Sequence, residues 1–434
     1  MNGLEPRDRY AELALDLLRL LFGDAFARDF GVKLWNGTIV TACGPLARFT
    51  LHIKHPAALR EMLRRPVDLG GGRAFVAGLI DVEGDLELAI DALLQVTAVD
   101  TLRAFRIMSL ARRLPRSPIA LLREARLHGR AHTLERDRAA IGFHYDLPIE
   151  FYQTFLDDSL TYSCAYFDEG IETLDAAQRA KIDHIFRKIR LERNERILDI
   201  GCGWGGLVVR ASSVFGARAT GITLSEPQFQ EARRRVAAEG ARADVRLCDY
   251  RELKDETFDK AVSVGMFEHV GRRNLKTYFK AAFAALRPGG LFLNHGIANQ
   301  NVSTRDNAER SFIGRFIFPD GDLLRISEAL RIAESVGFEI RDVENLRQHY
   351  VRTLAMWVAS LERNRERAIS VAGEQTYRAW RLYMAGSAQG FRSGRLGLYQ
   401  VLLGRPDNTG SLDIPATRRD IYRAPIESFE RRTV

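Results

Sequence analysis

The chain has 434 residues, more than one ordinary hydrophobic core organises, so we expect two domains or one heavily elaborated domain. Its hydrophobic fraction of 46% and charged fraction of 28% are those of a soluble globular protein, and without an apolar run of eighteen residues or an apolar signal region we expect no membrane-spanning helix and no secretory signal. The net charge of +8 indicates an anionic partner, with nucleic acid and an acidic lipid surface both open.

The four cysteines contain no C-x-x-C pair and are too sparse for a disulfide framework. They are Cys43, Cys164, Cys202 and Cys248. We therefore expect a reducing, cytoplasmic location, and no metal site is predicted.

Residues 1–100 predict a small α+β module. An apolar helical stripe within residues 1–30 precedes a hairpin around Asn36-Gly37, and residues 47–53 alternate as a strand. After a short helix, we expect Gly70-Gly71-Gly72 to interrupt the helical structure. Residues 86–96 are expected to be helical. No polar cluster here suggests chemistry, so we interpret the module as a lipid-docking or dimerising unit.

Residues 101–138 predict a strongly basic helical linker with aliphatic residues between the arginines. Helices of this kind can lie on an anionic lipid surface. The alternative is a solvated linker whose apolar stripe packs on the next domain. Aromatic residues suited to stacking on bases are missing, which disfavours nucleic acid as the partner.

Residues 139–404 alternate between apolar strands and helical patterns, which predicts a doubly wound, mostly parallel sheet. A helical insertion at about 350–388 separates the last two strands, and residues 405–434 form a polar tail. Ligands of such sheets bind at the carboxyl ends of the strands, and insertions there commonly cover the crevice.

The run 196–206 is an apolar strand that ends at Asp199 and continues into alternating glycines, Gly201, Gly203 and Gly205. Glycine lets backbone approach a ligand, and the following helix presents N–H donors. The spacing differs from that of dinucleotide binders and resembles the first motif of Rossmann-like S-adenosylmethionine methyltransferases. A turn that only packs strand against helix is the alternative.

Other strand ends also carry polar side chains. Thr223, Ser225 and Gln228 follow one strand, and Asp249-Tyr250 follows the next, where a carboxylate and an aromatic face suit adenine. Glu268-His269 ends a further strand, either as functional groups or as a structural ion pair, and His295 ends another.

Six motifs then occur in the order and spacing of the cyclopropane-fatty-acyl-phospholipid synthase family, which includes the mycolic acid cyclopropane synthases. The chain resembles this family over about residues 140–404. The motifs are Tyr162-Ser-Cys-Ala-Tyr-Phe, Leu198-Asp-Ile-Gly-Cys-Gly-Trp-Gly, Thr223-Leu-Ser-x-x-Gln228, Met266-Phe-Glu-His-Val-Gly, Phe316-Ile-Phe-Pro and Tyr350-x-x-Thr-Leu-x-Met-Trp357.

The resemblance implies a class I methyltransferase fold, a seven-stranded sheet with helical insertions, and S-adenosylmethionine as cofactor. With the strand-end residues, the cofactor-binding set becomes Tyr145, Tyr162, Ser163, Asp199, Gly201, Gly203, Thr223, Gln228, Asp249 and Tyr250. It also implies a bicarbonate ion in the active site, held by Cys164, Glu268, His295, Tyr350 and the backbone at Ile297.

The activity implied by the resemblance is transfer of a methylene group to the cis double bond of unsaturated acyl chains of membrane phospholipids. Methyl transfer leaves a carbocation, and bicarbonate assists its deprotonation. Cys164 is interpreted as a polar wall, because the reaction needs no covalent enzyme intermediate. We expect a homodimer, located in the cytoplasm and peripherally associated with the anionic inner face of the membrane.

Four alternatives stay open. A related fatty-acyl C-methyltransferase would divert the cation to a methylene- or methyl-branched chain. A methyltransferase for small molecules would not need Glu268, His295 and Tyr350, which are present. The intact Asp199, Gly201 and Gly203 argue against a non-catalytic lipid-binding protein, and the motifs argue against a nucleic-acid methyltransferase.

Overall fold

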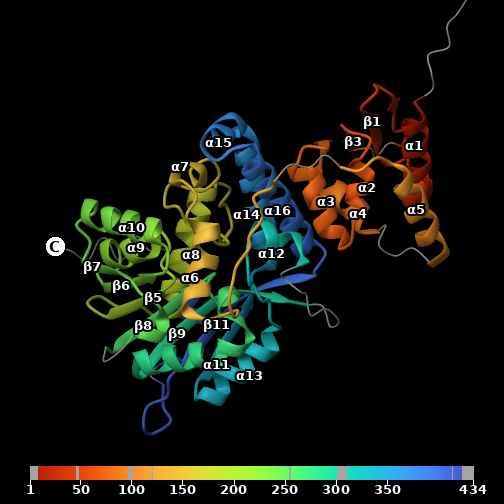
Figure 1. The fold of residues 1–434 in the computed structure, drawn as a ribbon. Coiled ribbons are helices and arrows are strands. Elements are labelled where there is room, and N and C mark those ends of the chain that lie inside the picture. Colours follow the sequence, from red (N-terminus) through yellow and green to blue (C-terminus); the bar gives the residue numbers. More distant parts are fainter. Residues whose placement is uncertain are drawn as a thin grey trace, which may run out of the picture. The chain divides into compact units, whose positions relative to one another are not determined.

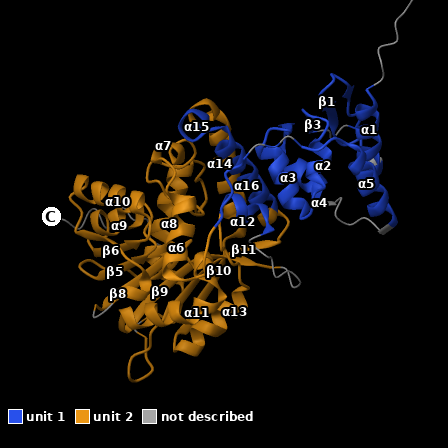
Figure 2. Cartoon of the chain, viewed as in Figure 1, with its two compact units in different colours: residues 1–126, 307–317, 368–389 blue, residues 127–306, 318–367, 390–434 orange. Residues whose placement is uncertain are grey.

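The structure is a computed structural model of the chain, and it describes residues 8–44, 48–95, 101–117, 119, 121–253, 256–300, 310–412 and 414–422 (Figure 1). Contacts divide the chain into two compact units (Figure 2). Unit 1 comprises residues 1–126, 307–317 and 368–389, and unit 2 comprises residues 127–306, 318–367 and 390–434. Each unit therefore draws on separate stretches of sequence.

Unit 1 contains a four-stranded sheet of order β2-β1-β3-β4, in which β1 and β3 are parallel and the other pairs antiparallel. Its elements are α1 (Arg9–Phe22), η1 (Gly23–Ala25), β1 (Gly31–Leu34), β2 (Ile39–Val40), β3 (Phe49–Ile53), α2 (Ala58–Met62), α3 (Val67–Val76), β4 (Ile80–Gly84), α4 (Leu86–Gln95), α5 (Thr101–Arg113) and α12 (Phe312–Phe316). The predicted α+β character and the hairpin at Asn36-Gly37 are confirmed, with Gly37 at φ 86°. The apolar stripe of α1 is buried, as its periodicity predicts.

The predicted break at the three glycines is wrong, because Gly70, Gly71 and Gly72 lie inside α3 and are buried. Absent side chains allow close approach: a Cβ on Gly72 would collide with the ring of Phe312, and one on Gly70 with the carbonyl oxygen of Arg64. Close packing of the helix compensates for the conformational entropy that glycine loses.

The predicted continuous helix over 101–138 is also wrong. α5 ends at Arg113, and among the described residues the chain is not helical again until α6 (Leu134–Tyr145). Pro115 and Pro118 lie just after α5, where proline restricts the preceding residue to extended backbone. The basic composition continues through residues 101–138, whereas the helix ends at Arg113.

Part of the predicted insertion packs with N-terminal residues. Its helices are α14 (Arg347–Arg363), α15 (Arg365–Ala372) and α16 (Glu374–Arg392). Within unit 1, the buried guanidinium of Arg378 donates to the carbonyl oxygens of Phe75 and Ile80, both at 2.6 Å, and to Asp81 Oδ2 at 3.0 Å. Burial acts to raise the pKa of Asp81, but Arg378 and Lys54 outweigh it and lower that pKa to about 2.

Unit 2 contains the seven-stranded sheet of order β10-β11-β9-β8-β5-β6-β7. Only β11 runs antiparallel to its neighbours β9 and β10, so the predicted mostly parallel sheet is confirmed. The strands are β5 (Arg196–Ile200), β6 (Arg218–Thr223), β7 (Ala243–Leu247), β8 (Phe258–Val264), β9 (Leu286–Asn299), β10 (Glu339–Asn345) and β11 (Leu396–Gly404).

Helices cover both faces of this sheet (Figure 1). Alternate side chains of one strand enter different cores: Ile197 packs in a cluster with α8 and α9, and Leu198 in a cluster with α11 and α13. These helices and the remaining ones of unit 2 are α7 (Ile149–Tyr152), α8 (Leu174–Lys188), α9 (Gly206–Ser213), α10 (Glu226–Ala238), η3 (Tyr250–Glu252), α11 (Phe267–Ala285), α13 (Ile326–Val336) and α17 (Arg419–Tyr422). The doubly wound architecture brings the βα turns together at one edge of the sheet.

The predicted polar tail is described only to residue 422, with residue 413 also outside the described residues. Its described part includes α17, and Asp420 forms an ion pair with Arg190 at 2.8 Å. In the described part of the chain, no helix has the length and apolarity needed to cross a bilayer.

Candidate active site

A pocket lies at the carboxyl ends of β5, β6, β7 and β8 in unit 2. All ten predicted cofactor-binding residues line it. They are Tyr145, Tyr162, Ser163, Asp199, Gly201, Gly203, Thr223, Gln228, Asp249 and Tyr250. The fold thus gathers side chains that are separated by up to a hundred residues in sequence around one space.

The glycine turn after β5 forms the floor of this pocket. Gly201, Gly203 and Gly205 have φ of 87°, 54° and 84°, a region that L-residues with a side chain rarely adopt. A Cβ on Gly201 would lie 3.0 Å from Met266, whereas Gly203 faces open space and Gly205 packs against Ala232. The turn therefore has both of the roles considered for it. Gly205 lets the start of α9 pack against α10, while Gly201 and Gly203 leave room in the pocket.

Asp199 lies one residue before the end of β5, and the Oδ1 of its buried carboxyl has no hydrogen-bond partner among the described residues. Burial raises the pKa of Asp199 to about 7, although the nearby Lys181 acts to lower it. A buried polar oxygen that faces a pocket without a partner is costly unless a ligand satisfies it. This carboxyl is suited to accept a hydrogen bond from a bound cofactor.

Lys181 is a pocket residue that the sequence analysis missed. It projects from α8, is 1% exposed, and its Nζ donates to Ser163 Oγ at 2.7 Å. Burial lowers the pKa of Lys181 to about 8, against the opposing effects of Asp157 and Asp199. A lysine on the buried face of an amphipathic helix was the available signal, because Ala177, Ile182 and Ile185 lie on the same face.

The turn after β6 is built on hydrogen bonds among the three predicted polar residues. Thr223 Oγ1 donates to Gln228 Oε1 at 2.9 Å and accepts from the backbone N–H of Ser225 at 3.2 Å. Ser225 caps α10 and donates to Asp146 Oδ1 at 2.8 Å. Thr223 and Gln228 line the pocket, and Ser225 holds their turn in place.

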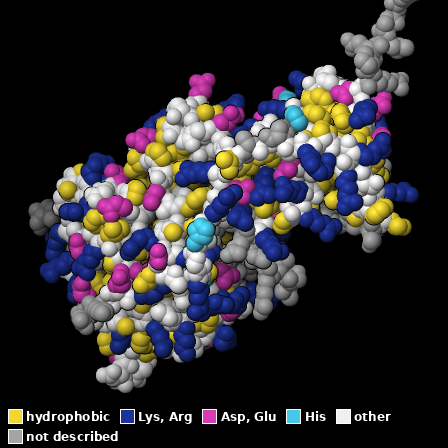
Figure 3. Space-filling view, viewed as in Figure 1, with side chains coloured by type: hydrophobic (Ala, Val, Ile, Leu, Met, Phe, Trp, Pro, Cys, Tyr) yellow, Lys and Arg dark blue, Asp and Glu magenta, His cyan; other side chains and the backbone are white. Residues whose placement is uncertain are grey.

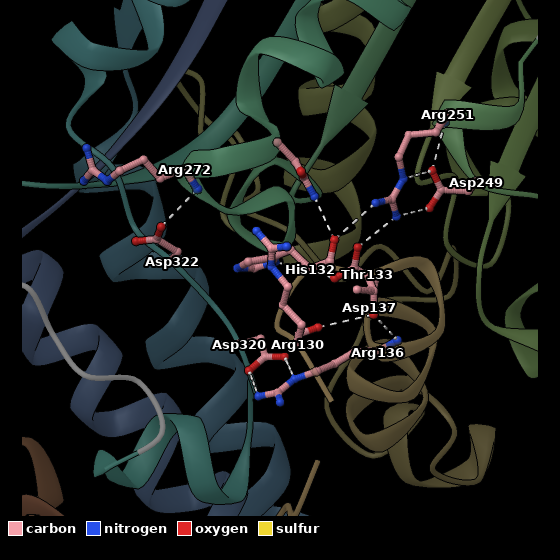
Figure 4. Close-up of polar contacts among 11 residues, drawn as sticks. Arg130, His132, Thr133, Arg136, Asp137, Asp249, Arg251, Arg272, Asp320 and Asp322 are labelled. Atoms are coloured by element: carbon pink, nitrogen blue, oxygen red, sulfur yellow. Dashed lines mark hydrogen bonds and ion pairs between the residues drawn. The ribbon is translucent and has the colours of Figure 1, made fainter. Parts of the chain in front are cut away.

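Asp249 and Tyr250 follow β7. Both oxygens of Asp249 accept from the guanidinium of Arg251 at 2.7 Å, and Arg251 reaches Asp137 Oδ2 at 2.8 Å (Figure 4). Burial raises the pKa of Tyr250, whose hydroxyl is buried without a partner among the described residues. Tyr250 thus offers the pocket an unsatisfied hydroxyl, whereas the carboxylate of Asp249 is already held by Arg251.

The segment 129–137, predicted as linker, is tied to the catalytic unit. Arg136 binds Asp320 through two hydrogen bonds of 2.5 and 2.7 Å (Figure 4). The carbonyl oxygen of His132 accepts from Asn274 Nδ2 at 3.0 Å. Asp137 and Ile141 line the pocket. Their role was invisible to the sequence because it depends on partners more than a hundred residues away.

The five predicted catalytic residues lie outside the residues that line this pocket. Cys164 follows the pocket residue Ser163, and Glu268 lies next to the pocket residue His269. Glu268 Oε1 accepts from the backbone N–H of Ile297 at 2.7 Å, which joins α11 to β9. The structure therefore brings Glu268 and Ile297 into direct contact.

His295 and Tyr350 occupy neighbouring elements. His295 Nδ1 lies 3.2 Å from Gln400 Nε2, across the β9–β11 pair. The ring of Tyr350, on α14, packs 4.6 Å from that of Phe391. Ala165 donates its N–H to Thr353 Oγ1 at 3.1 Å. This hydrogen bond joins the residue after Cys164 to α14, about one helical turn after Tyr350.

Two of these residues carry buried polar atoms without partners among the described residues: Glu268 Oε2 and His295 Nε2. Burial raises the pKa of Glu268 to about 7 and keeps the pKa of His295 well below its ordinary value. Near neutral pH, Glu268 can donate or accept a proton and His295 is uncharged. An oxyanion with both donor and acceptor oxygens fits this pair.

Cys164 is fully buried, and burial raises the pKa of its thiol. A thiol rather than a thiolate agrees with a wall residue, because the thiolate is the nucleophilic form. The nearby His269 is also neutral, since burial lowers its pKa to about 4, and it lies 3.3 Å from the hydroxyl of Tyr145. Over the described ranges, no group of three His, Cys, Asp or Glu side chains could hold a metal ion.

The family described as mycolic acid cyclopropane synthetase matches residues 132–401. The chain is 40% identical over 400 residues to a Pseudomonas putida protein named "Probable fatty acid methyltransferase", covering 90% of this chain and 96% of that protein. It is 33% identical over 382 residues to the Mycobacterium tuberculosis protein "Tuberculostearic acid methyltransferase UfaA1", covering 85% of this chain and 86% of that protein. The crystal structure of mycolic acid cyclopropane synthase CmaA1 complexed with SAH and CTAB matches with a TM-score of 0.58 and 34% identity, over 62% of this chain and 98% of that chain.

Proposed function

This chain belongs to the mycolic acid cyclopropane synthetase family and is an S-adenosylmethionine-dependent methyltransferase; on that premise, we propose that it transfers a methylene group to the cis double bond of unsaturated phospholipid acyl chains. The observation that carries the proposal is the pairing of two sites in unit 2. One is the pocket lined by all ten predicted cofactor residues, and the other is the adjacent pair of buried side chains, Glu268 and His295, with the backbone N–H of Ile297.

The reaction sets three demands on the protein. An alkene is a poor nucleophile, so it must be held against the electrophilic sulfonium methyl group that S-adenosylmethionine supplies when bound. The C–S bond breaks, a C–C bond forms, and the neighbouring carbon becomes a cation. Water must be excluded, and loss of one proton from the new methyl group then closes the ring.

The buried residues beside the pocket support these demands. Glu268 and His295 present unsatisfied polar atoms in a water-poor environment, and the N–H of Ile297 orients the carboxyl of Glu268. We propose that these groups, with Cys164 and Tyr350, hold a bicarbonate ion. Bicarbonate would supply a negative charge near the cation and an acceptor for the proton.

A neutral His295 and a Glu268 with a pKa of about 7 fit this ion, because one can accept or donate a hydrogen bond and the other can share a proton with it. Aromatic rings lie close by and can face the cation. Phe391 packs on Tyr350, and the ring of Phe318 lies 5.5 Å from that of His269. These side chains also exclude water.

The direct test is product analysis. Purified protein, S-adenosylmethionine and vesicles of an unsaturated phospholipid should yield a lipid that is heavier by one CH₂ and lacks its alkene. Recovery of unmodified lipid from folded protein that binds S-adenosylmethionine would refute the proposal.

A branched product is the second candidate, favoured by the similarity over 85% and more of the chain to proteins named as fatty acid and tuberculostearic acid methyltransferases. A hydride shift followed by proton loss would give a methylene group in place of the ring. Ring and exocyclic alkene have the same mass, so proton NMR of the purified acyl chain is the measurement that separates them.

We further propose that the protein acts as a homodimer in the cytoplasm, peripherally bound to the anionic inner face of the membrane. The outer face of α5 supports membrane binding: Leu102 is 80% and Phe105 73% exposed, and Arg106, Arg112 and Arg113 are exposed on the same helix. Co-sedimentation with anionic vesicles, weakened by salt, tests the surface, and light scattering of the eluted protein tests the dimer.

A further inference from the structure

Unit 1 contains a second cavity, far larger than a packing defect. Its volume is about 750 Å³. Sites for small molecules typically have about 300–1,000 Å³. The residues that line this unit 1 cavity include the apolar Ala104, Ile107 and Met108 and the arginines Arg65, Arg310 and Arg315.

The composition of this lining is amphipathic. Five of the lining residues are arginines, none is acidic, and the rest are apolar. Arg73 is neutralised by Glu124 through hydrogen bonds of 2.7 and 2.8 Å, and Arg64 lies 3.6 Å from Glu61. In the described part of unit 1, Arg65, Arg310 and Arg315 have no ion-pair partner. The cavity thus joins an apolar interior to three arginines for which the described part of unit 1 supplies no ion pair.

Arg315 is held in position rather than free in solvent. Its Nη1 donates to the carbonyl oxygen of Ala125 at 3.1 Å, and its buried Nε has no acceptor among the described residues. The N–H of Ala125 donates back to the carbonyl oxygen of Arg315 at 2.7 Å. The segment itself is anchored to α3, because the N–H of Phe312 donates to Asp68 Oδ2 at 3.0 Å. A positioned, buried and unsatisfied donor points to an acceptor on a ligand.

An apolar cavity with an excess of arginines suits a ligand that has a long apolar part and an anionic head. Helix α5 gives the source of that ligand. Its inner face lines the cavity with Ala104, Ile107 and Met108, while its outer face exposes Leu102 and Phe105. Hydrophobic and basic side chains lie side by side over this part of unit 1 (Figure 3). Such a face binds an anionic bilayer, which places phospholipids next to the helix.

We propose that the unit 1 cavity binds one anionic phospholipid, with an acyl chain among the apolar residues and the phosphate at Arg65, Arg310 and Arg315. This site is separate from the cofactor pocket and from the residues assigned to the reaction. The site gives the N-terminal unit a binding function of its own. This assignment does not depend on which product the catalytic unit makes.

The test counts phospholipids on the full chain. Delipidated protein is incubated with vesicles of phosphatidylglycerol and phosphatidylcholine, re-isolated, and examined by native mass spectrometry. Met108→Trp places a larger side chain in the cavity, and the double variant Arg310→Ala/Arg315→Ala removes two of the three arginines assigned to the phosphate. Arg48→Ala is the matched control, because Arg48 is an exposed arginine of unit 1 that lies outside α5 and does not line the cavity.

We expect Met108→Trp to carry less phospholipid than wild type and Arg48→Ala to carry the wild-type number. Removing a cation from an anionic lipid site weakens binding by about 5-fold, so the double variant should bind phosphatidylglycerol about 25-fold more weakly. S-adenosylmethionine binding, measured by calorimetry, should be unchanged in all variants, which shows that unit 2 is folded. Circular dichroism spectra that match wild type show that unit 1 is folded too.

Wild-type binding of phosphatidylglycerol in both Met108→Trp and the double variant would overturn the proposal. Retention of added oleate in place of phosphatidylglycerol would overturn the assignment to a phospholipid. Because the readout is bound lipid rather than turnover, a protein that makes no modified lipid but carries this phospholipid would refute the proposed function and leave the cavity assignment standing.

Discussion

The substitution Glu268→Gln separates the role of this residue in the reaction from its role in the fold. Glutamine has the same shape as glutamate, and its amide oxygen can still accept from the N–H of Ile297, which lies 2.7 Å from Oε1. It cannot take or give a proton. Because Glu268 does not line the cofactor pocket, affinity for S-adenosylmethionine should stay at the wild-type value. Turnover should fall by about 10²- to 10⁴-fold, the usual contribution of a group that assists proton transfer.

Stability should change with pH in a defined direction. The pKa of Glu268 is about 7 when folded, against an ordinary value of 4.5. Below pH 4.5 the carboxyl is protonated in both the folded and the unfolded state. As the pH rises, the unfolded state loses its proton first, so the wild type loses stability. This loss ends at about pH 7, where the folded state also loses its proton. The variant lacks this loss. Its free energy of unfolding, relative to wild type, should therefore rise by about 3 kcal/mol between pH 4.5 and 7.

The assay is urea unfolding of cofactor-free protein at pH 5, 6, 7 and 8, followed by circular dichroism. Glu239→Gln is the control, since Glu239 is exposed at the end of α10 and the substitution leaves the buried site of Glu268 intact. A Glu268→Gln difference that is flat across this range would refute the argument from burial. Unchanged turnover would remove Glu268 from the mechanism.

Three further predictions concern the cofactor pocket. Gly201→Ala should weaken S-adenosylmethionine binding at least tenfold, because φ is 87° and the new Cβ would lie 3.0 Å from Met266; Gly240→Ala, at φ 57° but in open space, should leave the affinity unchanged in the same calorimetric titration. Arg251→Ala should raise the dissociation constant about tenfold by releasing Asp249 and segment 129–137, whereas Arg246→Ala, which breaks ion pairs to Asp244 and Glu256 only, should not. Lys181→Met should weaken cofactor binding yet stabilise the protein at pH 7. The pKa of the buried lysine is lowered to about 8 from 10.5, so the wild type loses stability as the pH falls from 10.5 to 8. Equal free energies of unfolding of the two proteins in urea at pH 7 would contradict this.

Much of the fold could be predicted because its elements are encoded locally. The apolar stripe of α1 and the alternation of strands and helices from α8 to β10 each follow from a repeat of two or 3.6 residues, and the structure confirms them. Gly70–Gly72 was misread because local propensity disfavours a helix there. Packing of Phe312 against Gly72 reverses that preference, and nothing near Gly72 in sequence announces it.

The sequence by itself determined the class of the catalytic unit and predicted ten residues that line its pocket. Glycines at positive φ and polar residues at strand ends are required wherever such a sheet binds a ligand, so their pattern survives without coordinates. Only the tertiary structure decided which buried groups meet. Glu268 contacts Ile297, Lys181 contacts Ser163, and Arg251 joins Asp137 to Asp249. The hydrogen bond between Arg251 and Asp137 spans 114 residues of sequence. Such contacts depend on the closure of long loops and on burial. Burial raises or lowers a pKa, and the local sequence pattern does not reveal it.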